Sequence, residues 1–230
     1  MLSLAMDTST SSGSLAVLRN DRVLGVVGAS AEETYSSRLF RHLRILLEEL
    51  QLGLDRFDLF SVASGPGSFT GLRIGLAAAK GWAEVFSKPA IGVSVLEAVA
   101  AQATAPALLI ASLVDARRGQ VYGAIYERRD LVLVRRGEEM VLTPGEFFDL
   151  LAEATRGKSL ALVSPTPEAI EEPLEHSAFR NLPVERVSPF LAPVIGRLGY
   201  LRAASGEAGD PDGLEANYVR RSDAEMKWKD

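Results

Sequence analysis

The chain has 230 residues, of which 47% are hydrophobic, 24% charged and 7% aromatic, so it is long enough for one large or two small domains and is not disordered or fibrous. The 25 Lys and Arg against 30 Asp and Glu give a net charge of −5, and the resulting pI of about 5.3 counts against a stand-alone RNA-binding module. The lack of cysteine excludes disulfides, thiolate metal sites and cysteine nucleophiles, and two histidines, His42 and His176, cannot form a histidine-rich metal site unless the fold joins them.

The chain is predicted to begin with three short strands and an amphipathic helix. The first apolar run, Leu2 to Met6, lacks the basic region and apolar core of a signal peptide, and the runs Ser14 to Arg19 and Val23 to Ala29 follow it. Asn20-Asp21 is short enough for a hairpin turn. Leucines on one helical face predict a helix over Ser37 to Leu50. No apolar stretch reaches the roughly 18 residues that a bilayer span needs, so we expect a soluble cytosolic protein.

A strand, a glycine-rich loop and a second helix come next. The strand Leu59 to Ala63 is apolar throughout, which is typical of a buried parallel sheet. The loop Ser64 to Gly71 follows, and a helix is predicted over Leu72 to Phe86. A further strand at Pro89 to Val93 and a helix at Val95 to Ala103 complete the first half.

The order of elements restarts after Ala105-Pro106. The remaining predicted elements are strands at Leu108 to Val114, Gln120 to Glu127 and Leu131 to Arg135, a helix at Pro144 to Ala154, a strand at Leu160 to Val163, a helix at Pro167 to His176, a strand at Val184 to Val187 and a helix at Pro189 to Ser205. The series β-β-β-α-β-α thus appears twice, which predicts a duplicated α/β fold. We place an N-terminal lobe at residues 1–104, a smaller lobe at 105–188 and a loop and tail at 206–230, with the helix over about 189–205 packing back onto the N-terminal lobe.

The glycine loop is the strongest local feature of the sequence. Gly65 and Gly67 can adopt positive φ or let another backbone come close, and Ser68 or Thr70 can cap the following helix, whose N-terminus is a natural anion site. The dinucleotide fingerprint fails at Thr70, and a nucleophile elbow centred on Ser68 lacks its glycines. The loop is either a structural strand-to-helix turn or a ligand or partner loop.

Gly71 and Gly75 stand one turn apart in this helix region, where glycine costs up to about 1 kcal/mol relative to alanine. We expect that they allow another backbone to come close, with the helix Ser37 to Leu50 as the candidate neighbour. Two interpretations remain. Both helices pack on their own sheet, or together they form an intermolecular surface.

Asp7 and the hydroxyl side chains from Thr8 to Ser14 follow the first predicted strand. A hairpin of this kind can hold nucleotide phosphates while its aspartate manages a metal ion. A hydroxyl-rich Asx turn is the favoured interpretation, because no second glycine-rich loop for an adenosine is evident late in the chain. Asp115 mirrors Asp7 after the first strand of the second half.

Several segments, taken in order, resemble the TsaB (YeaZ-type) family. They are Asp7-Thr8-Ser9, the glycine segment from Gly65 to Gly75, Gly92-Val93-Ser94-Val95-Leu96, the segment from Val114 to Tyr122, and Asn217-Tyr218-Val219-Arg220. The resemblance runs over most of the chain, and the glycine segment is its most specific part. It implies the two-lobed sugar-kinase/Hsp70/actin-like (ribonuclease H-like) fold and a role in the bacterial tRNA threonylcarbamoyladenosine (t6A) pathway.

The resemblance also implies a pseudo-enzyme without catalytic residues. Members bind the related catalytic subunit TsaD, the complex recruits the ATPase TsaE, and together they modify N6 of adenosine 37 in tRNAs that read ANN codons. TsaD uses a His-x-x-x-His metal site on its first helix, but here only His42 lies in that region, so no metal is expected. We expect a homodimer in the absence of TsaD, contact with tRNA only through the complex, no membrane contact, and no cofactor beyond ATP held by TsaE or at the heterodimer boundary.

By the same resemblance, the helices Ser37 to Leu50 and Leu72 to Phe86 pack on TsaD or on a second copy of this chain. The expected contact residues are Arg38, Leu39, Arg41, His42, Gly71, Leu72, Gly75, Leu76, Ala79 and Trp82. The candidate residues of a degenerate nucleotide site are Asp7, Thr8, Ser9, Gly65, Gly67 and Ser68. The alternative function is an ATP-dependent small-molecule kinase or ATPase acting alone, with Asp7, its neighbouring hydroxyls and Asp115.

Overall fold

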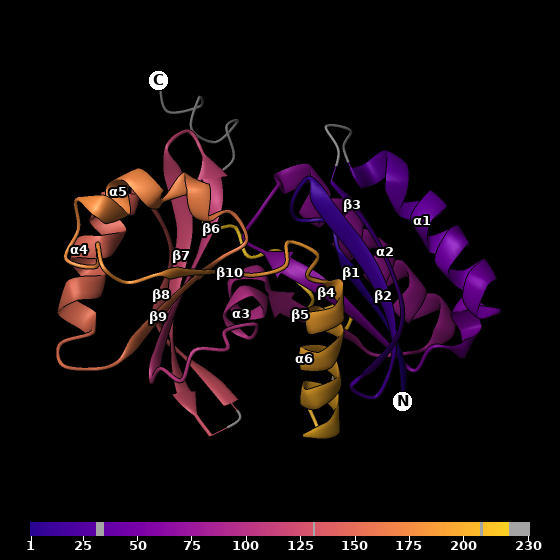
Figure 1. Ribbon diagram of the computed structural model, residues 1–230. Helices are drawn as coiled ribbons and strands as arrows, with labels where there is room; N and C mark the ends of the chain where they lie inside the picture. Colours follow the sequence, from indigo (N-terminus) through magenta and orange to yellow (C-terminus); the bar gives the residue numbers. More distant parts are fainter. Residues whose placement is uncertain (31–34, 131, 208, 221–230) are drawn as a thin grey trace. The chain divides into compact units, whose positions relative to one another are not determined.

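The computed structural model of the protein describes residues 1–30, 35–130, 132–207 and 209–220 (Figure 1). The chain divides into two compact units. Unit 1 comprises residues 1–95 and 190–230, and unit 2 comprises residues 96–189. The first boundary therefore lies after Val95 rather than after residue 104, so that all but the first residue of helix α3 (Val95–Ala100) is grouped with unit 2.

Unit 1 is a five-stranded mixed sheet with helices on both faces. Its elements are β1 (Leu2–Asp7), β2 (Ser12–Arg19), β3 (Arg22–Ser30), α1 (Tyr35–Leu50), the short 3-10 helix η1 (Leu54–Arg56), β4 (Leu59–Gly65), α2 (Phe69–Phe86), β5 (Ala90–Ser94) and α6 (Ala192–Ala204). The strand order is β3-β2-β1-β4-β5. The first three strands are antiparallel, whereas β4 and β5 run parallel to β1.

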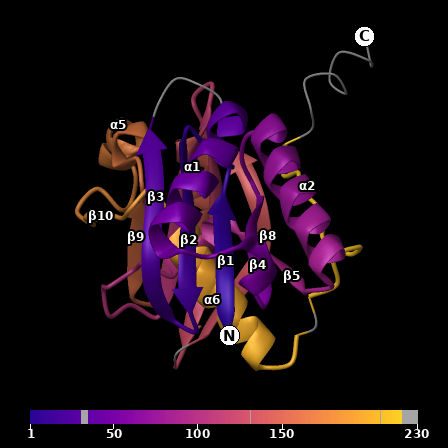
Figure 2. The same ribbon diagram turned by 90° about the vertical axis from the view of Figure 1, so that its right-hand side faces the viewer.

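The helices α1 and α2 contact each other and cover one face of this sheet, while α6 lies on the other face (Figure 2). The helix α1 packs on β2 and β3, α2 packs on β4 and β5, and α6 packs on β1, β2 and β4. Residues 190–204, which follow unit 2 in the sequence, thus return to the sheet formed by the N-terminal strands. The side chains of the central strands are enclosed on both faces, which explains their nearly unbroken apolar runs.

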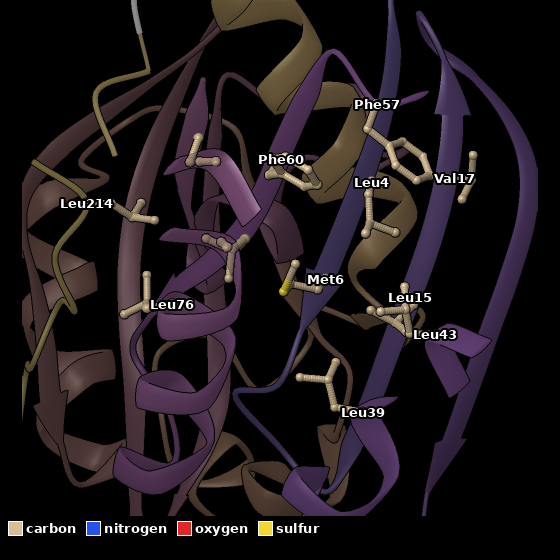
Figure 3. Packing of buried hydrophobic residues seen from close by; sticks show 14 of the residues in the cluster. Leu4, Met6, Leu15, Val17, Leu39, Leu43, Phe57, Phe60, Leu76 and Leu214 are labelled. Atoms are coloured by element: carbon tan, nitrogen blue, oxygen red, sulfur yellow. The ribbon is translucent and has the colours of Figure 1, made fainter. Parts of the chain in front are cut away.

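Alternation along β1 divides its side chains between the two faces of the sheet. Leu4 and Met6 belong to the cluster beneath α1 and α2, together with Leu39 (Figure 3). Ala5 instead lies against Gly196 of α6. This two-residue period is the one that a strand imposes. The ends of strands are set by local chemistry, as at the hairpin between β2 and β3, where Asn20 adopts a φ of 58°.

Unit 2 repeats the topology of unit 1. Its further elements are β6 (Leu109–Arg117), β7 (Gln120–Arg129), β8 (Val132–Leu142), α4 (Pro144–Ala154), β9 (Leu160–Ser164), the 3-10 helix η2 (Pro167–Ala169), α5 (Glu171–Glu175) and β10 (Val184–Arg186). The strand order β10-β9-β6-β7-β8 is the order of unit 1 read from the opposite edge. The predicted duplication of the α/β fold is therefore confirmed.

Two predicted elements differ clearly from the observed ones. The strand β8 continues to Leu142 rather than ending at Arg135, because its register against β7 shifts near Gly137, which has a φ of 82°. The helix predicted over Pro167 to His176 is interrupted at Ile170, whose φ of −128° is not helical. No helix within the described ranges is long and apolar enough to cross a membrane.

Candidate functional site

Asp7 ends β1 and is completely buried. Its Oδ1 accepts hydrogen bonds from the backbone N–H of Ser9 at 2.8 Å and from the Ser9 hydroxyl at 2.6 Å, which is an Asx turn. Its Oδ2 has no hydrogen-bond partner among the described residues. Burial raises the pKa of Asp7 to about 6, although the two hydrogen bonds from Ser9 oppose this shift. The carboxyl group is therefore weakly acidic and faces inward.

The turn between β1 and β2 uses its own polar groups internally. The N–H of Ser12 donates to the hydroxyl of Thr10 at 3.2 Å, just as the N–H of Ser9 donates to Asp7. Thr8 and Ser9 are each only 1% exposed. A phosphate-binding turn requires backbone N–H groups that point at the ligand. The N–H groups of Ser9 and Ser12 are already hydrogen-bonded within the turn.

The glycine loop covers this turn. The backbone N–H of Ser68 donates to the carbonyl of Ser9 at 2.7 Å, and the hydroxyl of Thr8 donates to the carbonyl of Gly71 at 2.7 Å. Ser68 also caps α2, because its Oγ accepts from the N–H of Gly71 at 3.3 Å. The loop is therefore a strand-to-helix turn that closes on the neighbouring hairpin. All six predicted residues of the degenerate nucleotide site are brought together in this contact or directly beside it.

The glycines of α2 are required by the same contact. A Cβ atom at Gly71 would overlap the carbonyl oxygen of Thr8, and one at Gly75 would overlap its hydroxyl oxygen. The expectation that these glycines admit the helix Ser37 to Leu50 is therefore wrong. They leave room for the turn between β1 and β2 of the same chain.

Arg38 supports the turn from α1. Its side chain is 2% exposed, and its guanidinium donates to the carbonyl of Ala29 and to the carbonyl of Ser11, both at 3.1 Å. A buried arginine is stable only when such donors are paired. The prediction that Arg38 faces a partner is contradicted, because its side chain is used within unit 1.

Most of the other predicted contact residues also face inward. Leu39, Leu72, Leu76 and Ala79 belong to the hydrophobic cluster of unit 1, and Gly75 is buried beside Thr8. His42 is 7% exposed, and burial together with the nearby Arg38 and Arg41 lowers its pKa. Because these side chains are buried within unit 1, they do not form a docking surface. Of the ten predicted residues, Arg41 is exposed and Gly71 and Trp82 are half-buried.

The outer face of the two helices presents other apolar side chains. Phe40 and Ile45 of α1 are 62% and 46% exposed, and Val85 of α2 is 75% exposed. Phe40 also lines a shallow groove along α1 with Leu43, Leu47 and their neighbours. The sequence contained a signal for Phe40 and Ile45, since they are apolar but lie outside the leucine stripe that predicts the buried face.

The hairpin of unit 2 repeats the Asx turn of unit 1. Asp115 Oδ1 accepts from the backbone N–H of Arg117 at 2.7 Å, as Asp7 accepts from Ser9. Asp115 is only partly buried, however, and its Oδ2 lies 3.5 Å from the Arg117 guanidinium. Asp7 and Asp115 thus mirror each other in local structure but not in environment. No group of three or more Asp, Glu or His side chains in the described ranges is placed to hold a metal ion.

Comparison with known proteins places the chain in a family. A protein-family profile described as TsaD, tRNA N6-adenosine threonylcarbamoyltransferase, matches residues 15–177. A Bacillus subtilis (strain 168) protein, described as tRNA threonylcarbamoyladenosine biosynthesis protein TsaB, is 30% identical over 233 residues, which cover 99% of this chain and 98% of the relative. The chain belongs to the TsaB family.

Solved structures agree with membership of the TsaB family. A Pseudomonas aeruginosa protein, described as uncharacterized with similarity to the peptidase YeaZ, has a TM-score of 0.76 at 25% identity, and the match covers 95% of this chain and 99% of that one. A putative N-acetylmannosamine kinase from Listeria monocytogenes has a TM-score of 0.50 at 12% identity, with 89% and 100% covered. This second likeness shows the fold alone. The chain thus has the same α/β fold as that kinase.

Membership of the TsaB family confirms the resemblance drawn from the motifs. It connects the chain to a family of tRNA threonylcarbamoyladenosine biosynthesis proteins. Three of the quoted motifs lie in one place in unit 1, because Asp7-Thr8-Ser9 contacts the glycine segment and Asn217-Tyr218 lies against it. The TsaB motifs of unit 1 therefore mark a packed junction between hairpin, loop, helix and tail.

Proposed function

We propose that this chain is a noncatalytic cytoplasmic subunit that binds and activates TsaD. The complex, with TsaE, forms N6-threonylcarbamoyladenosine at position 37 of ANN-decoding tRNAs. The chain holds no cofactor of its own, meets tRNA through the complex, and pairs with a second copy when TsaD is absent. Membership of the TsaB family supports the pathway, and the resemblance to that family is the reason for choosing TsaD as the partner.

The observation that carries the partner role is the exposed apolar set on α1 and α2. Phe40, Ile45 and Val85 stand on two helices that contact each other and cover one face of the sheet (Figure 2). Burying one such side chain contributes about 1.5–3 kcal/mol. Exposed apolar residues are individually common on protein surfaces, so these three positions motivate the proposal and their substitution is its test. We infer that TsaD covers the outer sides of these helices rather than the inner sides predicted from the sequence.

The closed hairpin supports the noncatalytic role. Asp7 is fully buried, and the glycine loop is hydrogen-bonded to the turn that would have to receive phosphates. A kinase or ATPase acting alone shares the fold, but fold does not determine activity. The filled turn is a reason to prefer the partner role.

The partner role is tested with purified TsaD from the same organism. We expect a heterodimer in size-exclusion chromatography and calorimetry with the unaltered chain. The double variant Phe40→Asp/Val85→Asp should lose at least tenfold in affinity, because it places two charges in an apolar contact.

The matched control is Leu201→Asp, which places a charge on α6 at a position 56% exposed and away from α1 and α2. It should bind TsaD as the unaltered chain does. Circular dichroism should show both variants folded. The absence of any complex with the unaltered chain would contradict the partner role. Equal affinities of the two variants would contradict the assigned face.

A further inference from the structure

The C-terminal tail of unit 1, residues 209–220, forms a strap along β5 and α2. It has no helix or strand of its own. Its beginning is joined to β5, because the N–H of Ala90 donates to the carbonyl of Gly209 at 3.2 Å. Leu214 is 6% exposed and belongs to the hydrophobic cluster of unit 1 (Figure 3). The middle of the strap is therefore anchored in the core.

The far end of the strap reaches the glycine loop. The N–H of Asn217 donates to the carbonyl of Ser64 at 2.7 Å, which ties the strap to the end of β4 by one backbone hydrogen bond. A Cβ atom at Gly65 would lie 2.6 Å from the carbonyl oxygen of Asn217. Gly65 has a φ of 121°, a conformation that is open to glycine. The strap thus fits against the first residues of the loop.

Tyr218 then packs against the first turn of α2. Its ring stacks on the ring of Phe69, the first residue of the helix, with centroids 4.4 Å apart and planes 26° apart. The Arg73 guanidinium lies 4.0 Å from the Phe69 ring centroid, and Arg73 Nε donates to the Tyr218 hydroxyl at 3.2 Å. Each of these three side chains thus contacts the other two, and together they join the strap to the helix.

These contacts form a series from the strap to the turn at Asp7. Tyr218 contacts Phe69, the neighbouring Ser68 donates to Ser9, and Ser9 donates to Asp7. We propose that the end of the strap is a latch, in which Tyr218 holds the first turn of α2 and the glycine loop closed over the β1–β2 turn. The latch goes beyond the partner role proposed above and does not depend on it.

The difference between the two ends of the strap makes detachment local. Leu214 is buried, whereas Tyr218 is 43% exposed and Arg73 is also exposed. Opening free energies within a folded protein vary from near zero at exposed ends to the global value in the core. Losing the Tyr218 contacts therefore frees the loop while the core remains folded.

Amide hydrogen exchange of the isolated chain tests the latch without any partner. The reporters are the amides of Ser68 and Asn217, which donate across the loop, and the reference is an amide in the β1–β2 ladder, such as that of Ala5. Tyr218→Ala should accelerate exchange at both reporters about three- to tenfold and leave the reference unchanged. This factor corresponds to the free energy that a pair of stacked aromatic rings contributes. Tyr218→Phe keeps the ring and should have a smaller effect.

Arg73→Ala provides an independent variant, since it removes the cation that contacts both Phe69 and Tyr218. It should accelerate the same reporters, and the double variant should be less than additive. The control is Leu201→Ala, at an exposed position of α6. Unchanged exchange at Ser68 in both single variants would overturn the latch. An equal acceleration of every amide in unit 1 would also overturn it, because that result assigns Tyr218 to global stability.

Discussion

Asp7 illustrates how one residue can keep its place in a fold while its environment changes its chemistry. It lies at the end of the central strand β1, with one carboxylate oxygen bonded to Ser9 and the other buried without a hydrogen-bond partner among the described residues. Burying a charge in this way costs free energy that hydrogen bonds to Ser9 only partly offset. The raised pKa of about 6 is the measurable consequence.

The pKa of Asp7 predicts a specific dependence of stability on pH. The folded-state pKa of about 6 exceeds the usual unfolded value of about 3.9, so the stabilising contribution is complete below about pH 3.9 and is lost as pH rises through 6. Asp7→Asn removes the charge and leaves an oxygen that accepts from Ser9. At pH 7–8 it should raise the free energy of unfolding by about 2 kcal/mol.

Urea unfolding of Asp7→Asn and of the unaltered chain, measured from pH 4 to pH 8, checks this prediction. The difference between the two proteins should be small at pH 4 and grow through pH 6. The other carboxyl groups of the chain are the same in both proteins, so their effect on stability cancels in the difference. A difference that is constant across this range would contradict the raised pKa.

Two glycines of α2 give opposite predictions at the residue scale. Gly75→Ala places a methyl group against the Thr8 hydroxyl and should destabilise the protein by about 1–3 kcal/mol. Gly81→Ala has no heavy atom within 4 Å of the new Cβ and should stabilise the helix by about 0.5–1 kcal/mol. Thermal unfolding should therefore show a lower Tm for the first variant and a higher Tm for the second. A higher Tm for Gly75→Ala would refute the contact with Thr8.

At the scale of elements, periodicity predicted where the strands and helices lie. The stripe Leu39, Leu43 and Leu46 predicted helix α1, and the structure buries it in the cluster of unit 1. The family resemblance assigns Leu39 of this stripe to a partner contact, which its burial contradicts. Periodicity identifies the face that is buried, but it does not distinguish burial within the chain from burial against another molecule.

The candidate site was only partly predictable for a related reason. Asp7-Thr8-Ser9 and the glycine segment were found as motifs, but their mutual contact joins segments about 60 positions apart, and no local pattern encodes it. Gly71 carried a visible signal, its cost in a helix, whereas the atom that requires it belongs to Thr8. The stacking of Tyr218 on Phe69 could likewise not be predicted from the sequence, because it joins the tail to a helix far away in the chain.

At the scale of the whole molecule, duplication explains why the fold alone does not assign an activity. The two sheets have equivalent strand orders, and Asp7 and Asp115 form equivalent Asx turns. Only the first turn is covered by a glycine loop with backbone hydrogen bonds to it among the described residues. The two turns therefore share a position in a common topology but differ in access.

This difference leads to a prediction for the isolated chain with ATP and magnesium. Calorimetry should show no binding heat at micromolar protein, and phosphate release should stay at background, because the N–H groups of Ser9 and Ser12 are already hydrogen-bonded within the turn. Tyr218→Ala, which loosens the glycine loop, should not create turnover, since the N–H groups of Ser9 and Ser12 stay hydrogen-bonded within the turn. Turnover that Asp7→Ala abolishes would instead establish the kinase or ATPase alternative.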